Sequence, residues 1–263
     1  MMSIRTLASR VTVTRGSAFR PLKHANVPLK TSTYVLAAPK FMPPAPLRSR
    51  GFTNIARRLD SVNPDHVIFG LIGANALVLF MWQTVDTSSK RQFMVTNFTT
   101  SPAHIMSGRV HTLLTAAFSH ADTGHFFGNM LGLFFFGREV CAILGPKRFL
   151  GLYLGSAVAA SLAQVVSQPL YSSRNSLSLG ASGAVNAVTA FSICMFPHST
   201  ILLMFVLPLP AYVVGTLFIL RDIWGAVGDR NTGVGHVAHL AGAGIGMFYY
   251  RRMFGRRSGF RRF

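Results

Sequence analysis

The sequence predicts an all-α membrane protein with six transmembrane helices. Half of its 263 residues are hydrophobic, and only seven are acidic, too few to solvate a soluble surface of this size. No Lys, Arg, Asp or Glu occurs between Arg174 and Arg221. The net charge of +19 comes from basic residues concentrated near the two ends, beside long apolar runs. Membrane topology and organellar targeting explain this distribution better than nucleic-acid binding does.

Six segments have the length and composition expected of spans, because a hydrocarbon core of about 30 Å requires roughly 20 apolar residues. They are residues 67–85, 125–144, 149–168, 179–196, 200–220 and 233–250. We expect Pro208 and Pro210 to kink the fifth span, since proline removes a helical hydrogen bond. The next residues, 221–232, are polar and are predicted to form a loop.

The chain divides into four parts by composition. Residues 1–52 carry many arginines and no acid, which is typical of a mitochondrial transit peptide, and a plastid peptide is the alternative. Arg50-Gly51-Phe52 is similar to a matrix-processing site, with cleavage before Thr53; the other interpretation is a basic, disordered tail that stays on the protein. Residues 53–66 are a linker, 67–250 the six-span domain, and 251–263 a basic tail. The predicted location is therefore the mitochondrial inner membrane, or else a plastid membrane.

Three polar sites fall at one predicted depth. Spans two, four and six run in the same direction, and near their starts they carry His125 with Asn129, Ser182, and His239. At 1.5 Å per residue, each side chain lies within roughly 10 Å of its helix start. Polar residues at membrane depth usually face the bundle interior and contact one another. The serine alone has a second interpretation as a small packing residue, because Gly, Ala and Ser are common where membrane helices touch.

These residues form three motifs that resemble the rhomboid family of intramembrane serine proteases. They are HxxxN from His125 to Asn129, GxSG from Gly180 to Gly183, and AHxxG from Ala238 to Gly242. The resemblance covers residues 67–250 and implies a rhomboid-like bundle that cleaves membrane-anchored substrates in or near their transmembrane segments. The paired histidines of Gly235-His-Val-Ala-His239 resemble the mitochondrial branch.

The resemblance also implies the site. Ser182 is the expected nucleophile and His239 the expected base, with His236 as a rival base three residues earlier. None of the seven acids is expected at the depth of these residues, so the sequence predicts a Ser–His dyad and no triad.

The family pattern assigns the oxyanion hole to His125, Asn129 and the Ser182 N–H, with Gly180 and Gly183 in support. Many members have a tyrosine where this chain has Asn186, which either bonds His239 or leaves its ring less firmly held. Four glycines are expected to let span six approach span four: Gly235, Gly242, Gly244 and Gly246.

No cofactor, metal or nucleic-acid partner is expected. The chain contains no HExxH motif, and Cys141 and Cys194 stand in apolar segments without metal-ligand spacing. The expected partners are transmembrane substrates and the lipid bilayer, with the oligomeric state left open. The alternative function is a non-catalytic rhomboid-like protein that binds and routes transmembrane segments.

Overall fold

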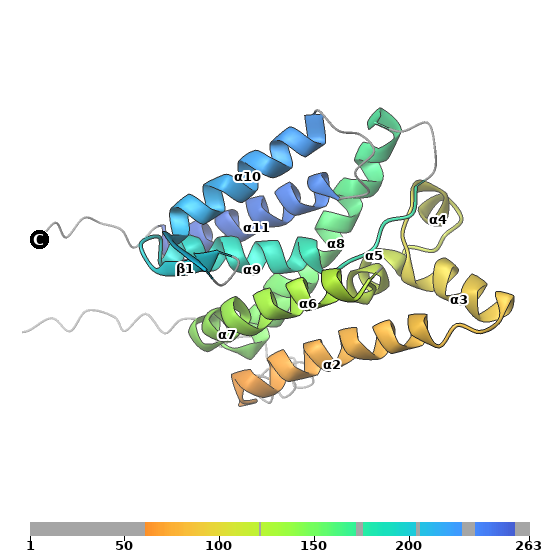
Figure 1. The fold of residues 1–263 in the computed structure, drawn as a ribbon, viewed down its shortest axis with the longest axis horizontal. Coiled ribbons are helices and arrows are strands. Elements are labelled where there is room, and N and C mark those ends of the chain that lie inside the picture. Colours follow the sequence, from red (N-terminus) through yellow and green to blue (C-terminus); the bar gives the residue numbers. More distant parts are fainter. Residues whose placement is uncertain (1–60, 121, 172–175, 204–205, 228–234, 256–263) are drawn as a thin grey trace, which may run out of the picture. The chain divides into compact units, whose positions relative to one another are not determined.

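The computed structural model describes residues 61–255, apart from 121, 172–175, 204–205 and 228–234. The predicted transit peptide, its processing site, most of the linker and residues 256–263 lie outside the described residues. Within the described part, the chain forms helices and one short hairpin (Figure 1). The helices are α2 (Pro64–Gln83), α3 (Ser88–Phe98), α4 (Pro102–Met106), α5 (Thr112–Thr115), α6 (Thr123–Gly132), α7 (Arg138–Leu144), α8 (Pro146–Tyr171), α9 (Ser182–Met195), α10 (Ala211–Val227) and α11 (His236–Phe254).

Two short turns and two strands complete the described structure. A 3-10 turn, η1 (Ala116–Phe118), follows α5, and a π-helical turn, η2 (Leu133–Gly137), joins α6 to α7. The strands β1 (Thr200–Leu203) and β2 (Leu207–Pro210) pair antiparallel, with Thr200 opposite Pro210.

Local chemistry explains where several helices begin and end. Asn63 caps α2 by accepting a hydrogen bond from the Asp65 N–H at 2.9 Å, and Pro64 is the first helical residue. Asp122 caps α6 by accepting from the His125 N–H at 2.8 Å. Gly145, with φ of 78°, ends α7 in a conformation that favours glycine. The Asp122 cap fixes the first turn of α6, on which His125 lies.

Three helical stretches are long and apolar enough to cross a membrane: Pro64–Gln83, Thr123–Leu144 and Pro146–Gln168. The second of these combines α6, η2 and α7. Ser182–Met195 is a shorter apolar helix. The described chain is therefore that of a membrane protein with three clear candidate spans, and the number six stays a prediction.

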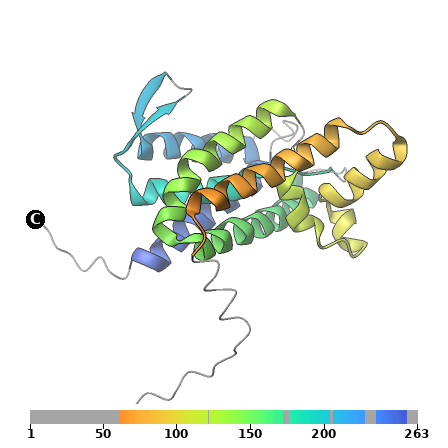
Figure 2. The ribbon, with the colours of Figure 1, turned by 90° about the horizontal axis from the view of Figure 1, so that it is seen from below.

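The predicted fifth span is wrong in its first half. Residues 200–203 and 207–210 form the β1–β2 hairpin, which stands away from the helices in Figure 2. Because proline lacks an N–H and disfavours a helix in the residue before it, Pro208 and Pro210 delay helix formation until Ala211 instead of kinking a helix. The helix then runs on to Val227, so part of the predicted 221–232 loop is helical. The consequence is that Asp222 lies on α10.

Helix α9 is enclosed by its neighbours. It packs against α8, α11, α10 and η2, and half of its residues are buried (Figure 1). Phe149, Tyr153, Val188 and Phe191 are among the fully buried side chains of the core around it. The start of α9, where Ser182 stands, is therefore fixed on several sides.

Two of the four expected glycines bring α11 against α9. A Cβ on Gly242 would lie 2.0 Å from the Gly183 carbonyl oxygen, and one on Gly246 would lie 2.0 Å from the Ala187 oxygen. Gly244 has open space instead, and a Cβ on Gly235 would make only an ordinary contact at 3.6 Å. The close approach therefore depends on Gly242 and Gly246.

Charged groups pair at the junction of η2 and α7. Arg138 donates two hydrogen bonds to the Asp65 carboxylate, at 2.7 and 3.0 Å, and Ser192 donates to Glu139 at 2.5 Å. These contacts account for an adjacent Arg–Glu pair within a long apolar stretch, because intramembrane charges need partners.

Candidate active site

Ser182 and His239 meet where α9 and α11 approach each other. Ser182 is the first residue of α9, and His239 is in the first turn of α11. The Ser182 Oγ lies 2.8 Å from Nε2 of His239, within hydrogen-bond distance. The first N–H groups of a helix lack intrahelical acceptors and carry partial positive charge. Ser182 therefore has an imidazole within hydrogen-bond distance and stands at the positive end of a helix.

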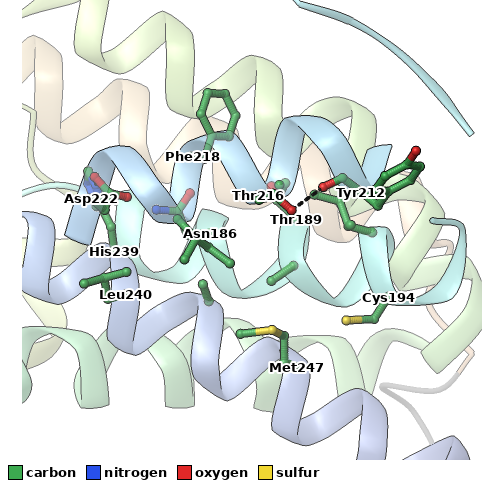
Figure 3. A pocket seen from close by; sticks show the side chains of 15 residues that line it. Asn186, Thr189, Cys194, Tyr212, Thr216, Phe218, Asp222, His239, Leu240 and Met247 are labelled. Carbon is green, nitrogen blue, oxygen red and sulfur yellow. Dashed lines mark hydrogen bonds and ion pairs between the residues drawn. The ribbon is translucent and has the colours of Figure 1, made fainter. Parts of the chain in front are cut away.

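A carboxylate lies on the other side of the His239 ring, which contradicts the expectation that no acid reaches this depth. Asp222 is buried, and its Oδ1 lies 3.2 Å from Nδ1 of His239 (Figure 3). The expectation failed because residues 221–232 were assigned to a loop, whereas α10 extends through Asp222. The signal that could have found it is the Pro208/Pro210 pair, which moves the helix start to Ala211 and puts Asp222 within the helix.

His236 shares the same carboxylate. Its Nδ1 lies 2.8 Å from Asp222 Oδ1, and its ring is buried. A Cβ on Gly225 would lie 2.2 Å from Nε2 of this ring, so glycine is needed for α10 to pass so close. Of the two candidate bases, His239 is the one whose Nε2 meets Ser182. The ligand atoms of Asp222, His236 and His239 all lie within 4.8 Å of one another and could hold a metal ion.

One of the predicted oxyanion-hole residues, His125, lies beside the turn that carries Gly180. Gly180 has φ of +129°, and a Cβ there would lie 2.8 Å from His125 Cε1 and 3.7 Å from the Ser182 Oγ. The His125 ring is thus packed on the GxSG turn. Gly183 supports the site differently, because a Cβ there would lie 2.5 Å from the Ala160 Cβ on α8.

Asn129 is buried, and its side-chain nitrogen is engaged within α6 and the preceding segment. It donates to the His125 carbonyl at 3.0 Å and lies 3.3 Å from Nε2 of His120. Burial, with the neighbouring His125 ring as a lesser cause, lowers the pKa of His120 to about 4. The ring is therefore neutral at pH 7, and its Nε2 can accept a hydrogen bond from the Asn129 amide. Asn129 would need to redirect one of these hydrogens to reach an oxyanion.

Asn186 does not replace the family's tyrosine as a partner of His239: among the described residues, the Nδ1 of that ring faces Asp222 instead. Asn186 lines a largely apolar cavity of about 220 Å³ between α9, α10 and α11 (Figure 3). Asp222 and His239 border the same cavity. The side-chain amide thus lies near the histidine without holding it.

Residues 107–256 match the family described as Rhomboid domain, which is more than half of the chain. The chain belongs to the rhomboid family. The matched range contains the residues of all three motifs and Asp222.

Named relatives are organellar rhomboids. The chain is 35% identical over 208 residues to "RHOMBOID-like protein 12, mitochondrial" of Arabidopsis thaliana, covering 74% of this chain and 60% of that protein. It is 33% identical to "Rhomboid protein 1, mitochondrial" of Saccharomyces cerevisiae, covering 71% and 53%, respectively. It is also 29% identical to "Rhomboid-like protein 16, chloroplastic" of Arabidopsis thaliana, covering 81% and 70%. The matches thus span 53–70% of the length of these rhomboid relatives, both mitochondrial and chloroplastic.

Proposed function

We propose that this rhomboid is an intramembrane serine endopeptidase in which Ser182 is the nucleophile, His239 the general base and Asp222 the group that orients the base. The supporting observation is the continuous chain of contacts from Ser182 Oγ to His239 Nε2 at 2.8 Å and from His239 Nδ1 to Asp222 Oδ1 at 3.2 Å. This order of groups is that of a serine-protease triad. The proposal therefore replaces the predicted dyad with a triad.

The proposed role of Asp222 follows from imidazole chemistry. A neutral imidazole has one N–H donor and one acceptor nitrogen. An ionised carboxylate only accepts, so Asp222 keeps the ring proton on Nδ1 and leaves the Nε2 lone pair facing Ser182. When Oγ attacks the substrate carbonyl, its proton moves to Nε2, and Asp222 stabilises the resulting imidazolium.

The later steps use the same groups. The imidazolium gives its proton from Nε2 to the leaving amine as the peptide C–N bond breaks, which leaves an acyl-enzyme on Ser182. A water then loses a proton to Nε2 and attacks the acyl carbon, and Oγ recovers a proton as the acid product leaves. The N–H groups at the start of α9 are proposed donors to the oxyanion, joined by His125 and by Asn129 once an amide hydrogen turns from His120.

The proposed substrates are membrane-anchored proteins that are cut in or near their transmembrane segments. Family membership supports this class, and the apolar stretches around the site support a location within the bilayer. We further propose that α9, α10 and α11 join the three clear candidate spans to give six crossings. The Arg-rich segment 1–52 and the mitochondrial names of two relatives favour the mitochondrial inner membrane, with a plastid membrane as the alternative.

Cleavage of a test substrate with one transmembrane segment, in liposomes, tests this proposal. We expect Ser182→Ala and His239→Ala to abolish cleavage while the proteins remain folded. Asp222→Asn should lower kcat by about 10²–10⁴-fold with little change in KM, because the asparagine amide favours the wrong tautomer. Asp86→Asn is the matched control, since that carboxylate is exposed and pairs with Lys90 on the surface, and it should leave kcat unchanged.

Two results would reject parts of the proposal. Undiminished cleavage by Ser182→Ala would remove the mechanism as a whole. An Asp222→Asn enzyme as active as Asp86→Asn would return the site to a dyad. The alternative, a protein that binds transmembrane segments without cutting them, predicts no cleavage of any substrate by the unmodified protein.

A further inference from the structure

We propose that Asp222, His236 and His239 also form a binding site for a divalent transition-metal ion of the Zn²⁺ type, and that the ion inhibits the enzyme. The site itself rests on the geometry of the three side chains. The inhibition rests on the proposed function, because it requires His239 to be the base.

The donor set suits Zn²⁺. Two imidazole nitrogens and one carboxylate oxygen are preferred ligands of this ion, and three protein ligands with one open position is the usual arrangement of an accessible site. His236 and His239 are three residues apart on α11 and share one face of that helix. Asp222 approaches this face from α10, so the ligands come from two helices.

The distances are close to those that the ion requires. Zn–N and Zn–O bonds of about 2.0–2.1 Å in a tetrahedral site place ligand atoms about 3.3 Å apart. Asp222 Oδ1 lies 2.8 Å from Nδ1 of His236 and 3.2 Å from Nδ1 of His239. Both nitrogens thus already face the same oxygen, and all three ligand atoms lie within 4.8 Å of one another. Admitting the ion requires the carboxylate to move back from the two rings, so that the ion takes the place of the two hydrogen bonds.

The cavity beside the cluster supplies access and room for a water ligand. It has a volume of about 220 Å³ and is bordered by Asp222 and His239 themselves. Its other walls are mostly apolar, as Figure 3 shows for Phe218, Leu240 and Met247. Cys194 also lines the cavity, but it is a single thiol, whereas the Asp222 end holds three ligand atoms within 4.8 Å of one another. We therefore expect an ion that enters to bind at the Asp222 end.

Binding would block the proposed base through its tautomer. When Nδ1 of His239 uses its lone pair to bind the ion, its proton moves to Nε2 and the ring stays neutral. An Nε2–H group can donate to Ser182 Oγ but cannot accept the serine proton. His236 undergoes the same exchange with no effect on Ser182. Cleavage therefore stops without any change at the serine itself.

Metal binding can be measured without protease activity. Co²⁺ is added to purified full-length Ser182→Ala protein in detergent, because its visible absorption reports tetrahedral nitrogen and oxygen ligation. We expect one Co²⁺ per chain, displaced by one equivalent of Zn²⁺. His236→Gln and Asp222→Asn, each made in the Ser182→Ala background and checked for folding by thermal denaturation, should weaken binding at least tenfold. His66→Gln, which removes an exposed histidine from α2, is the matched control and should bind normally.

Inhibition is then measured on the active enzyme. Zn²⁺ should reduce substrate cleavage over the concentration range in which it binds. The cleavage rate of each variant is divided by the zinc-free rate of the same variant. On this scale, His236→Gln should need at least tenfold more Zn²⁺ for half-inhibition than the unmodified enzyme. No tetrahedral Co²⁺ spectrum in Ser182→Ala, or equal binding by both ligand variants and His66→Gln, would overturn the site. Tight binding with undiminished cleavage would overturn the inhibition. If the unmodified protein binds Zn²⁺ tightly but cleaves no substrate, the result supports the metal site and contradicts the proposed function.

Discussion

Replacing Gly242 with alanine should separate α11 from α9 and disconnect His239 from Ser182. The added Cβ would lie 2.0 Å from the Gly183 carbonyl oxygen and 2.9 Å from its carbon, whereas ordinary contact begins at 3.4 Å. The shortfall to the oxygen is 3.4 − 2.0, or about 1.4 Å. Both atoms belong to the backbone at the start of α9, so neither can turn aside as a side chain would.

The separation of α11 from α9 directly displaces the His239 ring. Gly242 is one helical turn after His239, so a shift of about 1 Å at Gly242 is carried to the ring with little loss. A 2.8 Å hydrogen bond lengthened by this amount passes beyond hydrogen-bond range. We expect kcat to fall by roughly 100-fold or more, the usual effect of a 1 Å misplacement, and overpacking to cost about 1–3 kcal/mol of stability.

Gly244→Ala is the matched control on the same helix. A Cβ at that position would point into open space among the described residues, so the substitution should keep full activity and stabilise the helix by up to about 1 kcal/mol. Both variants are compared by liposome cleavage and by thermal denaturation in detergent. Full activity in Gly242→Ala, or equal losses in the two variants, would refute the argument that close helix packing positions the base.

The remaining predictions concern the GxSG turn and His120. Gly180→Ala should lose cleavage and about 1–3 kcal/mol of stability, because φ is +129° and the new Cβ would press on His125. Gly108→Ala is the control: φ there is 83° and the space is open, so this variant should lose stability through the backbone strain alone and stay active. For His120, the folded pKa of about 4 lies below its ordinary 6.5, so the unfolded chain binds more protons between those values. The contribution of His120 to the free energy of unfolding should therefore be fully present above pH 6.5 and fall by about 3 kcal/mol as the pH drops toward 4. His120→Gln, followed by denaturation in detergent across this range, should lack that loss, and an identical pH profile in the two proteins would contradict the burial argument.

The sequence predicted one polar contact of the site, that between Ser182 and His239, and missed the carboxylate of Asp222. Charge-free stretches and alternating helix directions placed Ser182 and His239 at one depth, and their side chains are in hydrogen-bond contact. The reason is general: helices in a compact bundle alternate in direction, and buried polar groups must find partners. The same reasoning could not say which glycines pack closely, since Gly242 and Gly244 differ only in the face of α11 on which they stand.

The hairpin and Asp222 were missed for one shared reason. An apolar run with two prolines was assigned to a helix by its hydropathy, although proline at alternate positions is incompatible with helical hydrogen bonding. Because the helix starts at Ala211, it continues past residue 220 to Val227, and Asp222 therefore lies within the bundle. Hydropathy also disfavours an acid inside a span, and only the positions of the two histidines reveal that this carboxylate has partners.

Labelling with a fluorophosphonate, which phosphonylates activated serine hydroxyls, tests the central claim most directly because it needs no knowledge of the substrate. The protein in detergent is treated with the reagent, and the modified residue is identified by mass spectrometry. The account predicts one adduct, on Ser182, that disappears in His239→Ala and forms much more slowly in Asp222→Asn. No adduct on Ser182, or labelling at the same rate in His239→Ala, would contradict it.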